Sequence, residues 1–136
     1  MTHSAREWPE LSETRDGPTI AALHLFSQVT GKVAVALLPW RNHGWHVTLH
    51  LHPRGLRTEL LHGSAGVFEM GLDLVAHHFT LADRAGMRTL PLAPMAVADF
   101  YGDAMALLTE AGHPVEIAPF PNEVRQYGLT RIGSQA

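Results

Sequence analysis

The sequence contains no cysteine among its 136 residues. This absence excludes a disulfide framework, thiolate metal sites and a cysteine nucleophile. Basic residues are also scarce, because ten lysines and arginines stand against thirteen acidic residues and give a formal net charge of -3. The basic residues are scattered, so no patch is available to displace counterions from phosphates, and we expect no nucleic-acid partner.

Long apolar runs are missing as well. None reaches the roughly 20 residues that a transmembrane helix requires, and residues 1–8 are too polar and mixed in charge for a signal peptide. We therefore expect no membrane partner and a cytoplasmic location. A chain of this length with 46% hydrophobic and 17% charged residues is typical of one globular domain, which buries about two-thirds of its unfolded surface.

Apolar residues recur at helical spacing in two segments. The first begins at Ile20, after a turn over residues 16–19 that ends in a capping Thr19, and Gly31 ends it. The second follows Pro94 and ends before the turn at residue 112. Two helices are therefore expected, one near each end of the chain.

Strands are predicted between and after these helices. The clearest alternation of apolar and polar residues runs from Trp45 to His52. The other predicted strands cover residues 32–38, 56–61, 67–75, 78–81, 87–92 and 115–118. The fold class expected is α+β, with an antiparallel sheet of about five to six strands packed against two helices. The whole chain is expected to form a single domain, with residues 1–17 as an N-terminal extension and residues 128–136 as a flexible tail.

Histidine is abundant, with ten residues in this short chain. His46, His50 and His52 share one face of the predicted strand, where same-face neighbours lie roughly 6.5–7 Å apart. Such a group can converge on one ligand or on a divalent metal, and Zn or Fe are the candidates. A third protein ligand would then come from His62, Glu69 or Asp73. The alternative is a polar strand face that meets only solvent.

A loop next to this strand combines polar residues with tryptophans. Asn42, His43 and His46 stand between or beside Trp40 and Trp45, and indole rings with imidazoles are a common lining of small-molecule pockets. The alternative is a structural loop whose histidines bond to backbone groups.

Two further polar groups are candidates for the same site. His24, Gln28 and Lys32 follow at intervals of four and form one stripe if the helix runs that far; the stripe is either solvated or faces a cavity in which Lys32 binds a carboxylate. Asp73 and His77 form a pair in which the carboxylate would orient the imidazole as a general base. Exposed side chains without a joint role are the alternative.

Segments that carry a family resemblance run through most of the chain, from about residue 8 to residue 123. They are Trp8-Pro9, Leu23-His24, Gln28, Gly31-Lys32, Pro39-Trp40, Asn42-His43, Trp45-His46-Val47, Pro53-Arg54-Gly55-Leu56, Asp73, His77, Leu92, Pro94 and Val97-Ala98-Asp99-Phe100-Tyr101. On these segments the chain resembles a bacterial domain of unknown function, DUF5996, as a stand-alone version of its first half. The resemblance implies no established activity. Ala76 stands where this family usually has Asp, and His50 and His52 replace positions that are commonly apolar or aromatic.

The function expected from these residues is a small, cofactor-independent enzyme that acts on a small organic molecule by histidine general acid/base chemistry. An isomerase, cyclase or lyase fits best, since the sequence has no nucleophile elbow and no phosphate-binding loop. The catalytic residues expected are His43, His46, Asp73 and His77. The substrate-binding residues expected are His24, Gln28, Lys32, Trp40, Asn42, Trp45, Arg54 and Tyr101.

Two other functions stay open at this point. One is a metal-dependent enzyme that uses His46, His50 and His52 with a divalent ion. The other is a non-catalytic module that binds a small molecule or a protein. The expected partner is a small-molecule ligand in the favoured case, and a homodimer is compatible with the sequence.

Overall fold

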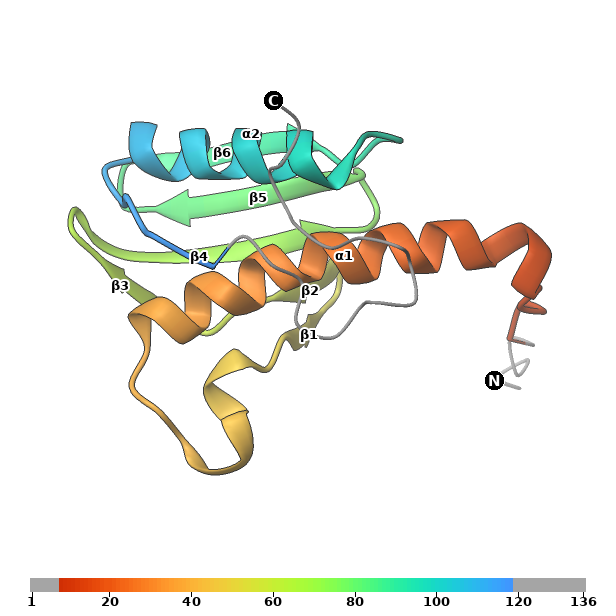
Figure 1. Ribbon diagram of the computed structural model, residues 1–136, viewed down its shortest axis with the longest axis horizontal. Helices are drawn as coiled ribbons and strands as arrows, with labels where there is room; N and C mark the ends of the chain where they lie inside the picture. Colours follow the sequence, from red (N-terminus) through yellow and green to blue (C-terminus); the bar gives the residue numbers. More distant parts are fainter. Residues whose placement is uncertain (1–7, 119–136) are drawn as a thin grey trace, which may run out of the picture.

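The computed structural model describes residues 8–118 of the chain. These residues form one six-stranded antiparallel sheet in the order β1-β2-β4-β5-β6, with β3 paired to β4. Two long helices contact each other over one face of it (Figure 1). The α+β prediction, with an antiparallel sheet of about six strands against two helices, is confirmed. In chain order the elements are α1 (Glu13–Leu37), η1 (Asn42–Val47), β1 (His50–His52), β2 (Gly55–Arg57), β3 (Leu61–Gly63), β4 (Gly66–Asp73), β5 (His78–Asp83), β6 (Gly86–Pro91) and α2 (Val97–Glu110).

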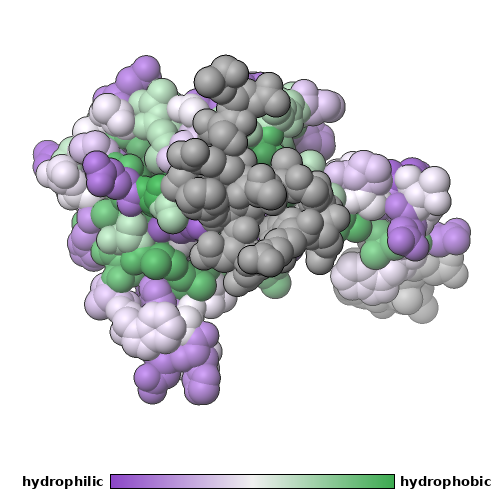
Figure 2. All heavy atoms as spheres, viewed as in Figure 1, coloured by the Kyte–Doolittle hydropathy of each residue, from purple (hydrophilic) through white to green (hydrophobic). Residues whose placement is uncertain are grey.

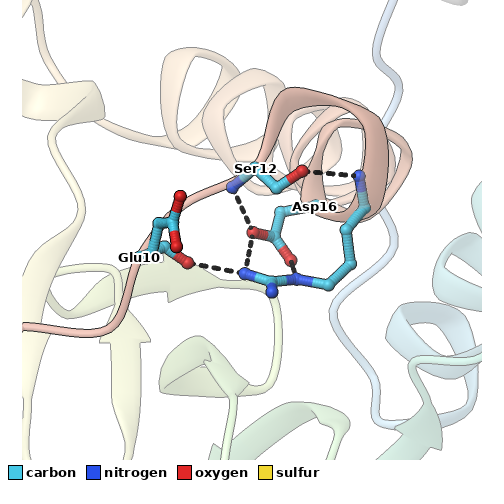
Figure 3. A network of polar contacts seen from close by, with 4 residues as sticks. Glu10, Ser12 and Asp16 are labelled. Atoms are coloured by element: carbon cyan, nitrogen blue, oxygen red, sulfur yellow. Dashed lines mark hydrogen bonds and ion pairs between the residues drawn. The ribbon is translucent and has the colours of Figure 1, made fainter.

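Helix α1 begins earlier than its apolar pattern predicts. Ser12 caps it, because the Ser12 hydroxyl accepts a hydrogen bond from the backbone N–H of Arg15, and the Asp16 carboxylate accepts one from the N–H of Ser12 at 2.8 Å. Arg15 in turn binds Asp16 at 2.8 Å (Figure 3). The predicted turn over residues 16–19 is therefore wrong, and the helix runs through it with Pro18 inside.

The same helix also extends further than predicted. It continues through Gly31 to Leu37, so the strand predicted over residues 32–38 is wrong. Its buried side chains follow helical spacing, with Phe26, Val29 and Val33 all packed into the core. The packing of this face outweighs the modest cost of a glycine within a helix, which is about 1 kcal/mol.

By length and composition, α1 is the one candidate for a membrane span among residues 8–118. This corrects the expectation that no apolar stretch is long enough. The core helix of a soluble protein passes the same test, as does a signal sequence near an N-terminus. A third of its most apolar stretch is buried within the domain, which is compatible with a soluble protein.

The strand predicted from Trp45 to His52 is largely wrong. Residues Asn42–Val47 form a short 3-10 helix, in which His43 and Gly44 adopt left-handed backbone angles with φ of 58° and 69°. The left-handed angles turn the chain, and only His50–His52 pair with the sheet. Period-two alternation alone could not reveal this, because it carries no information about the backbone angles just before it.

The remaining strand predictions have mixed outcomes. The predicted strand over residues 56–61 is interrupted: three residues, 58–60, face two residues of β4, so a bulge separates β2 from β3. Buried Thr58 fills this bulge, and its hydroxyl accepts the N–H of Met70 at 3.1 Å. The antiparallel strands β4, β5 and β6 and helix α2 are confirmed. The strand predicted over residues 115–118 is wrong, because that segment is irregular.

The hydrophobic core lies between the sheet and the two helices. The ring of Phe100 in α2 lies 4.4 Å from that of Phe26 in α1 and 5.5 Å from that of Phe79 in β5. These three rings join both helices to the sheet. The other buried members of the core are Val29, Val33, Ala34, Leu61, Phe68, Met70, Leu72, Leu81, Ala104, Leu107 and Leu108.

The opposite face of the sheet carries polar side chains. Alternate residues of β4 from Phe68 to Leu72 are buried under the helices, so Glu69, Gly71 and Asp73 face the other way. Residues directly opposite each other in neighbouring strands share a face. The register therefore adds the following residues to this outer face: His50, His52, Gly55, Arg57, His78, Thr80, Ala82, Met87, Thr89 and Pro91.

Candidate functional site

The predicted site residues fall into three separate regions, and the first is the η1 loop, which projects from the body of the domain (Figure 1). His46 is only 2% exposed, and its Nδ1 accepts a hydrogen bond from the backbone N–H of Arg41 at 3.3 Å. Its ring and that of Trp40 meet in a T-shaped contact, with 5.1 Å between ring centroids. Arg41 also pairs with Glu59 at 3.0 Å, which ties the loop to the sheet. These contacts make His46 a residue that holds the loop together.

The predicted pocket walls of this loop lie on its surface. Trp40 is 76% exposed and Trp45 is 67% exposed, and the ring of His43 lies 6.2 Å from that of Trp45. Asn42 and His43 are exposed as well. Figure 2 shows a hydrophilic tip on this loop, with apolar surface above it where the loop meets the body. The two indoles are therefore exposed to solvent, Trp45 beside His43 and Trp40 beside His46, and do not enclose a pocket as predicted.

The second region is the outer face of the sheet. His50 and His52 of β1 point to it, whereas His46 is buried within η1. The single strand that was predicted to carry all three histidines is not formed. His46 therefore does not share a strand face with His50 and His52, as the proposed metal site requires. Within residues 8–118, no three His, Asp or Glu side chains gather as a metal ligand set.

Asp73 belongs to this outer face, and its carboxylate stabilises the turn that follows β4. Its Oδ2 accepts a hydrogen bond from Nε of Arg54 at 2.7 Å, and its Oδ1 accepts the N–H groups of Val75 and Ala76. Arg54 and then the Ala76 N–H are the main causes that lower the pKa of Asp73 to about 2. The carboxylate thus shapes the β4–β5 turn that carries His77, rather than orienting the His77 ring through these bonds.

The third region is an apolar cleft of about 390 Å³ at the end of the domain where β4 turns into β5. It lies between the first half of α1, this turn, and the segment that joins β6 to α2. Its lining residues are Pro18, Thr19, Ala22, Leu23, Phe26, Leu74, His77, Leu92, Ala93, Pro94 and Met95. His77 is the one titratable side chain among them.

His77 is held at the cleft by its backbone. Its φ is 57°, a left-handed angle that is uncommon for a residue with a side chain. Its carbonyl oxygen accepts the N–H of Leu92 at 2.7 Å, so the turn is fastened to the segment that forms the opposite wall. An unusual backbone angle that other contacts maintain is frequent at functional sites.

The remaining predicted residues are distributed over the two helices. Because α1 is continuous, His24, Gln28 and Lys32 do form one stripe, and the nitrogens His24 Nε2 and Gln28 Nε2 lie 3.4 Å apart. His24 is exposed, and the other two are half-buried. Tyr101 is half-buried and packs against the core from α2. None of these four residues lines the cleft, although Leu23 beside His24 does.

The buried pair of His113 and Asp83 could not be predicted from the sequence patterns. His113 is 1% exposed, its Nε2 lies 3.1 Å from Oδ2 of Asp83, and its ring stacks on Phe68 at 4.2 Å. The N–H of Ala85, above all, and His113 lower the pKa of Asp83. His113 Nδ1 has no hydrogen-bond partner within the part of the chain described. No local pattern links residues 30 positions apart, so sequence reasoning missed this pair.

Comparison with known proteins settles the family. The model of a family of unknown function, DUF5996, matches residues 8–130, which is nearly the whole chain. The chain belongs to the DUF5996 family. Neither curated proteins nor solved structures gave a match. Leu23, His77, Leu92 and Pro94, which contributed to the resemblance, line the apolar cleft of this DUF5996 domain.

Proposed function

We propose that this DUF5996 domain binds a small, uncharged and largely apolar molecule in the cleft between α1, the β4–β5 turn and the segment before α2. The observation that carries the proposal is the lining: apolar side chains on every wall and a single titratable group, His77. Small-molecule sites typically combine such walls with a few polar groups that fix the orientation of the ligand. A charged ligand would find no Lys, Arg, Asp or Glu among these lining residues and would lose much of its hydration without compensation.

Catalysis is a second candidate at the same place. The backbone of His77 is fixed by its bond to Leu92, and an imidazole can serve as a general acid or a general base. This supports a cofactor-independent reaction of isomerase, cyclase or lyase type, with His77 as the acid or base. His43 and His46 lie on the η1 loop, which Figure 1 shows well apart from the β4–β5 turn. The role of acid or base is therefore assigned to His77 and not to these two histidines.

The cytoplasm is proposed as the place of binding. The support is that α1 packs its apolar side chains, among them Phe26, Val29 and Val33, into the core of the domain. A helix used in this way favours a soluble protein over a membrane-bound one.

An uncharged fluorescent probe tests the cleft directly. N-phenyl-1-naphthylamine brightens in apolar surroundings, and its binding to the full chain is followed by fluorescence. Ala93→Phe places a ring in the exposed wall of the cleft and should weaken binding by about tenfold or more, because a filled pocket loses the area that the probe would bury. The matched control is Ala36→Phe, at an exposed position near the other end of α1, and it should bind like the wild type.

The position of the probe is checked by NMR. The ring signals of His77 should move on addition of the probe, whereas those of His43 on the distant loop should stay in place. Equal binding by the wild type and Ala93→Phe, or a shift confined to His43, would remove the cleft as the site.

A further inference from the structure

The outer face of the sheet, opposite the two helices, carries a second hollow that is distinct from the apolar cleft. It has a volume of about 260 Å³ and lies over the middle of β4 and β5. Gly71 and Ala82 form its floor, since both face outward and neither has a long side chain. A methyl group added at Gly71 would come within 2.9 Å of the Thr80 hydroxyl and 3.0 Å of the Leu56 carbonyl oxygen, so the hydroxyl stands at the side of this floor.

Charged side chains of both signs surround this floor. Arg57 stands directly opposite Gly71 in the register, and its Nη1 lies 3.4 Å from Oε1 of Glu69. On the other side Arg54 pairs with Asp73 at 2.7 Å. Both arginines are about half exposed, and each guanidinium has N–H donors beyond the one that bonds to its carboxylate. Positive and negative groups thus alternate around one small hollow.

The two ion pairs differ in how firmly they are made. Asp73 is fully engaged by Arg54 and by two backbone N–H groups of the turn. The Arg57–Glu69 pair is long, at 3.4 Å, and open to solvent, and ion pairs of that kind contribute little to stability. Separating Arg57 from Glu69 to admit a ligand therefore costs little, whereas charge-assisted hydrogen bonds to each of them are gained.

We propose that this hollow binds a small zwitterion of the α-amino-acid type, with its carboxylate on Arg57 and its ammonium group on Glu69. A zwitterion matches the two signs of charge around the hollow. A simple anion would be repelled by the carboxylates, and a simple cation would be repelled by the arginines. The groups that would hold the zwitterion stand on paired strands, so their backbone positions are fixed before binding. The site is independent of the proposed apolar cleft, and the failure of either leaves the other intact.

The test compares three related small molecules by NMR titration of the full-length chain at pH 7 and constant ionic strength. L-alanine carries both charges, propionate lacks the amino group, and ethylammonium lacks the carboxylate. We expect L-alanine to shift the backbone amides of Gly71 and Thr80 and to bind at least tenfold more tightly than either fragment. A tenfold difference in Kd is about 1.4 kcal/mol, which is near the lower limit for losing one hydrogen bond to a charged group.

Variants identify the residues responsible. Arg57→Gln and Glu69→Gln should each weaken L-alanine binding by about tenfold, and Ala82→Leu should abolish it by filling the floor. Arg84→Gln removes the same charge from the exposed β5–β6 turn outside the hollow and should bind like the wild type. The amide spectrum of each variant reports whether it is folded. Absence of shifts in the wild type, equal binding of propionate, or undiminished binding by folded Arg57→Gln would overturn the proposal.

Discussion

At the scale of single residues, Gly63 shows how tightly the buried histidine is enclosed. A methyl group at Gly63 would lie 2.4 Å from Nδ1 of His113 and 2.9 Å from a ring carbon of Phe68. The histidine has little room to give way, because its Nε2 is bonded to Asp83 and its ring is stacked on Phe68. The missing side chain at Gly63 is therefore a requirement of the His113–Asp83 pair.

Gly63→Ala should destabilise the domain by about 1–3 kcal/mol, the usual cost of forcing extra volume into a packed core. The matched control is Gly102→Ala in α2, where a methyl group would meet nothing within 4 Å. That change should stabilise the domain by about 0.5–1 kcal/mol, because alanine is the better helix former. Urea unfolding measures both, and equal stabilities of the two variants would contradict the placement of His113.

Asp73 makes the stability of the domain depend on pH in the acid range. Its pKa falls from 3.8 to about 2 on folding, chiefly because Arg54 binds the carboxylate. A group whose pKa is lower in the folded state stabilises that state above its unfolded pKa, and the contribution disappears as the pH falls through the folded value. The contribution of Asp73 is therefore complete above about pH 4 and lost towards pH 2.

Asp73→Asn removes this contribution at every pH. We expect the variant to lose less stability than the wild type between pH 4 and pH 2, as measured by thermal unfolding at a series of pH values. Glu69→Gln removes a neighbouring carboxylate and serves as the matched control for the loss of one acidic side chain. Parallel curves for the wild type and Asp73→Asn would show that Arg54 does not engage the carboxylate in solution.

At the scale of secondary-structure elements, the continuity of α1 rests on its buried face. Gly31 has free space around its Cα, since an added methyl group would meet nothing within 4 Å. Gly31→Ala should therefore stabilise the domain by about 0.5–1 kcal/mol in chemical unfolding. Gly44→Ala is the contrasting variant, because φ of 69° there disfavours a side chain, and it should destabilise. A loss of stability on Gly31→Ala would indicate that the helix ends at that residue.

Elements with their own local signals were predictable from the sequence. Strands β4 to β6 alternate regularly, and the Asp83–Gly86 turn between the last two is marked by its residue types. Gly31 and Gly17-Pro18 look like helix breaks locally. Packing of the buried face overrides Gly31, and the Ser12 cap begins the helix before Gly17-Pro18. Residues 45–52 alternate like a strand. The left-handed backbone angles at His43 and Gly44 instead place the first of them in a short 3-10 helix.

The site was predictable only in part, for a similar reason. His77 was singled out in the sequence, but the walls around it come from residues 18–26, 74–77 and 92–95, which only the tertiary fold brings together. His113 and Asp83 lie 30 positions apart in the sequence, and the tertiary fold likewise brings them together. Local patterns carry no information about such long-range assembly.

At the scale of the whole molecule, the two groups of predicted catalytic histidines belong to different ends of the domain. The η1 loop with His46 projects below the sheet in Figure 1, and the β4–β5 turn with His77 lies at the far end of α1. His46 is tied to Arg41 and through it to Glu59, whereas His77 is tied to Leu92. Substitutions at distant sites that share no partners have effects that add.

His46→Ala should therefore destabilise the domain by about 1–3 kcal/mol, because it removes a buried ring and leaves the Arg41 N–H without its acceptor. The affinity of the cleft for N-phenyl-1-naphthylamine should nevertheless stay unchanged. His77→Asn, which tolerates the left-handed angle, should have the opposite profile, with nearly wild-type stability and altered probe binding. If His46→Ala weakened the probe as much as His77→Asn does, the two ends would be coupled, and a single shared site would again be the better description.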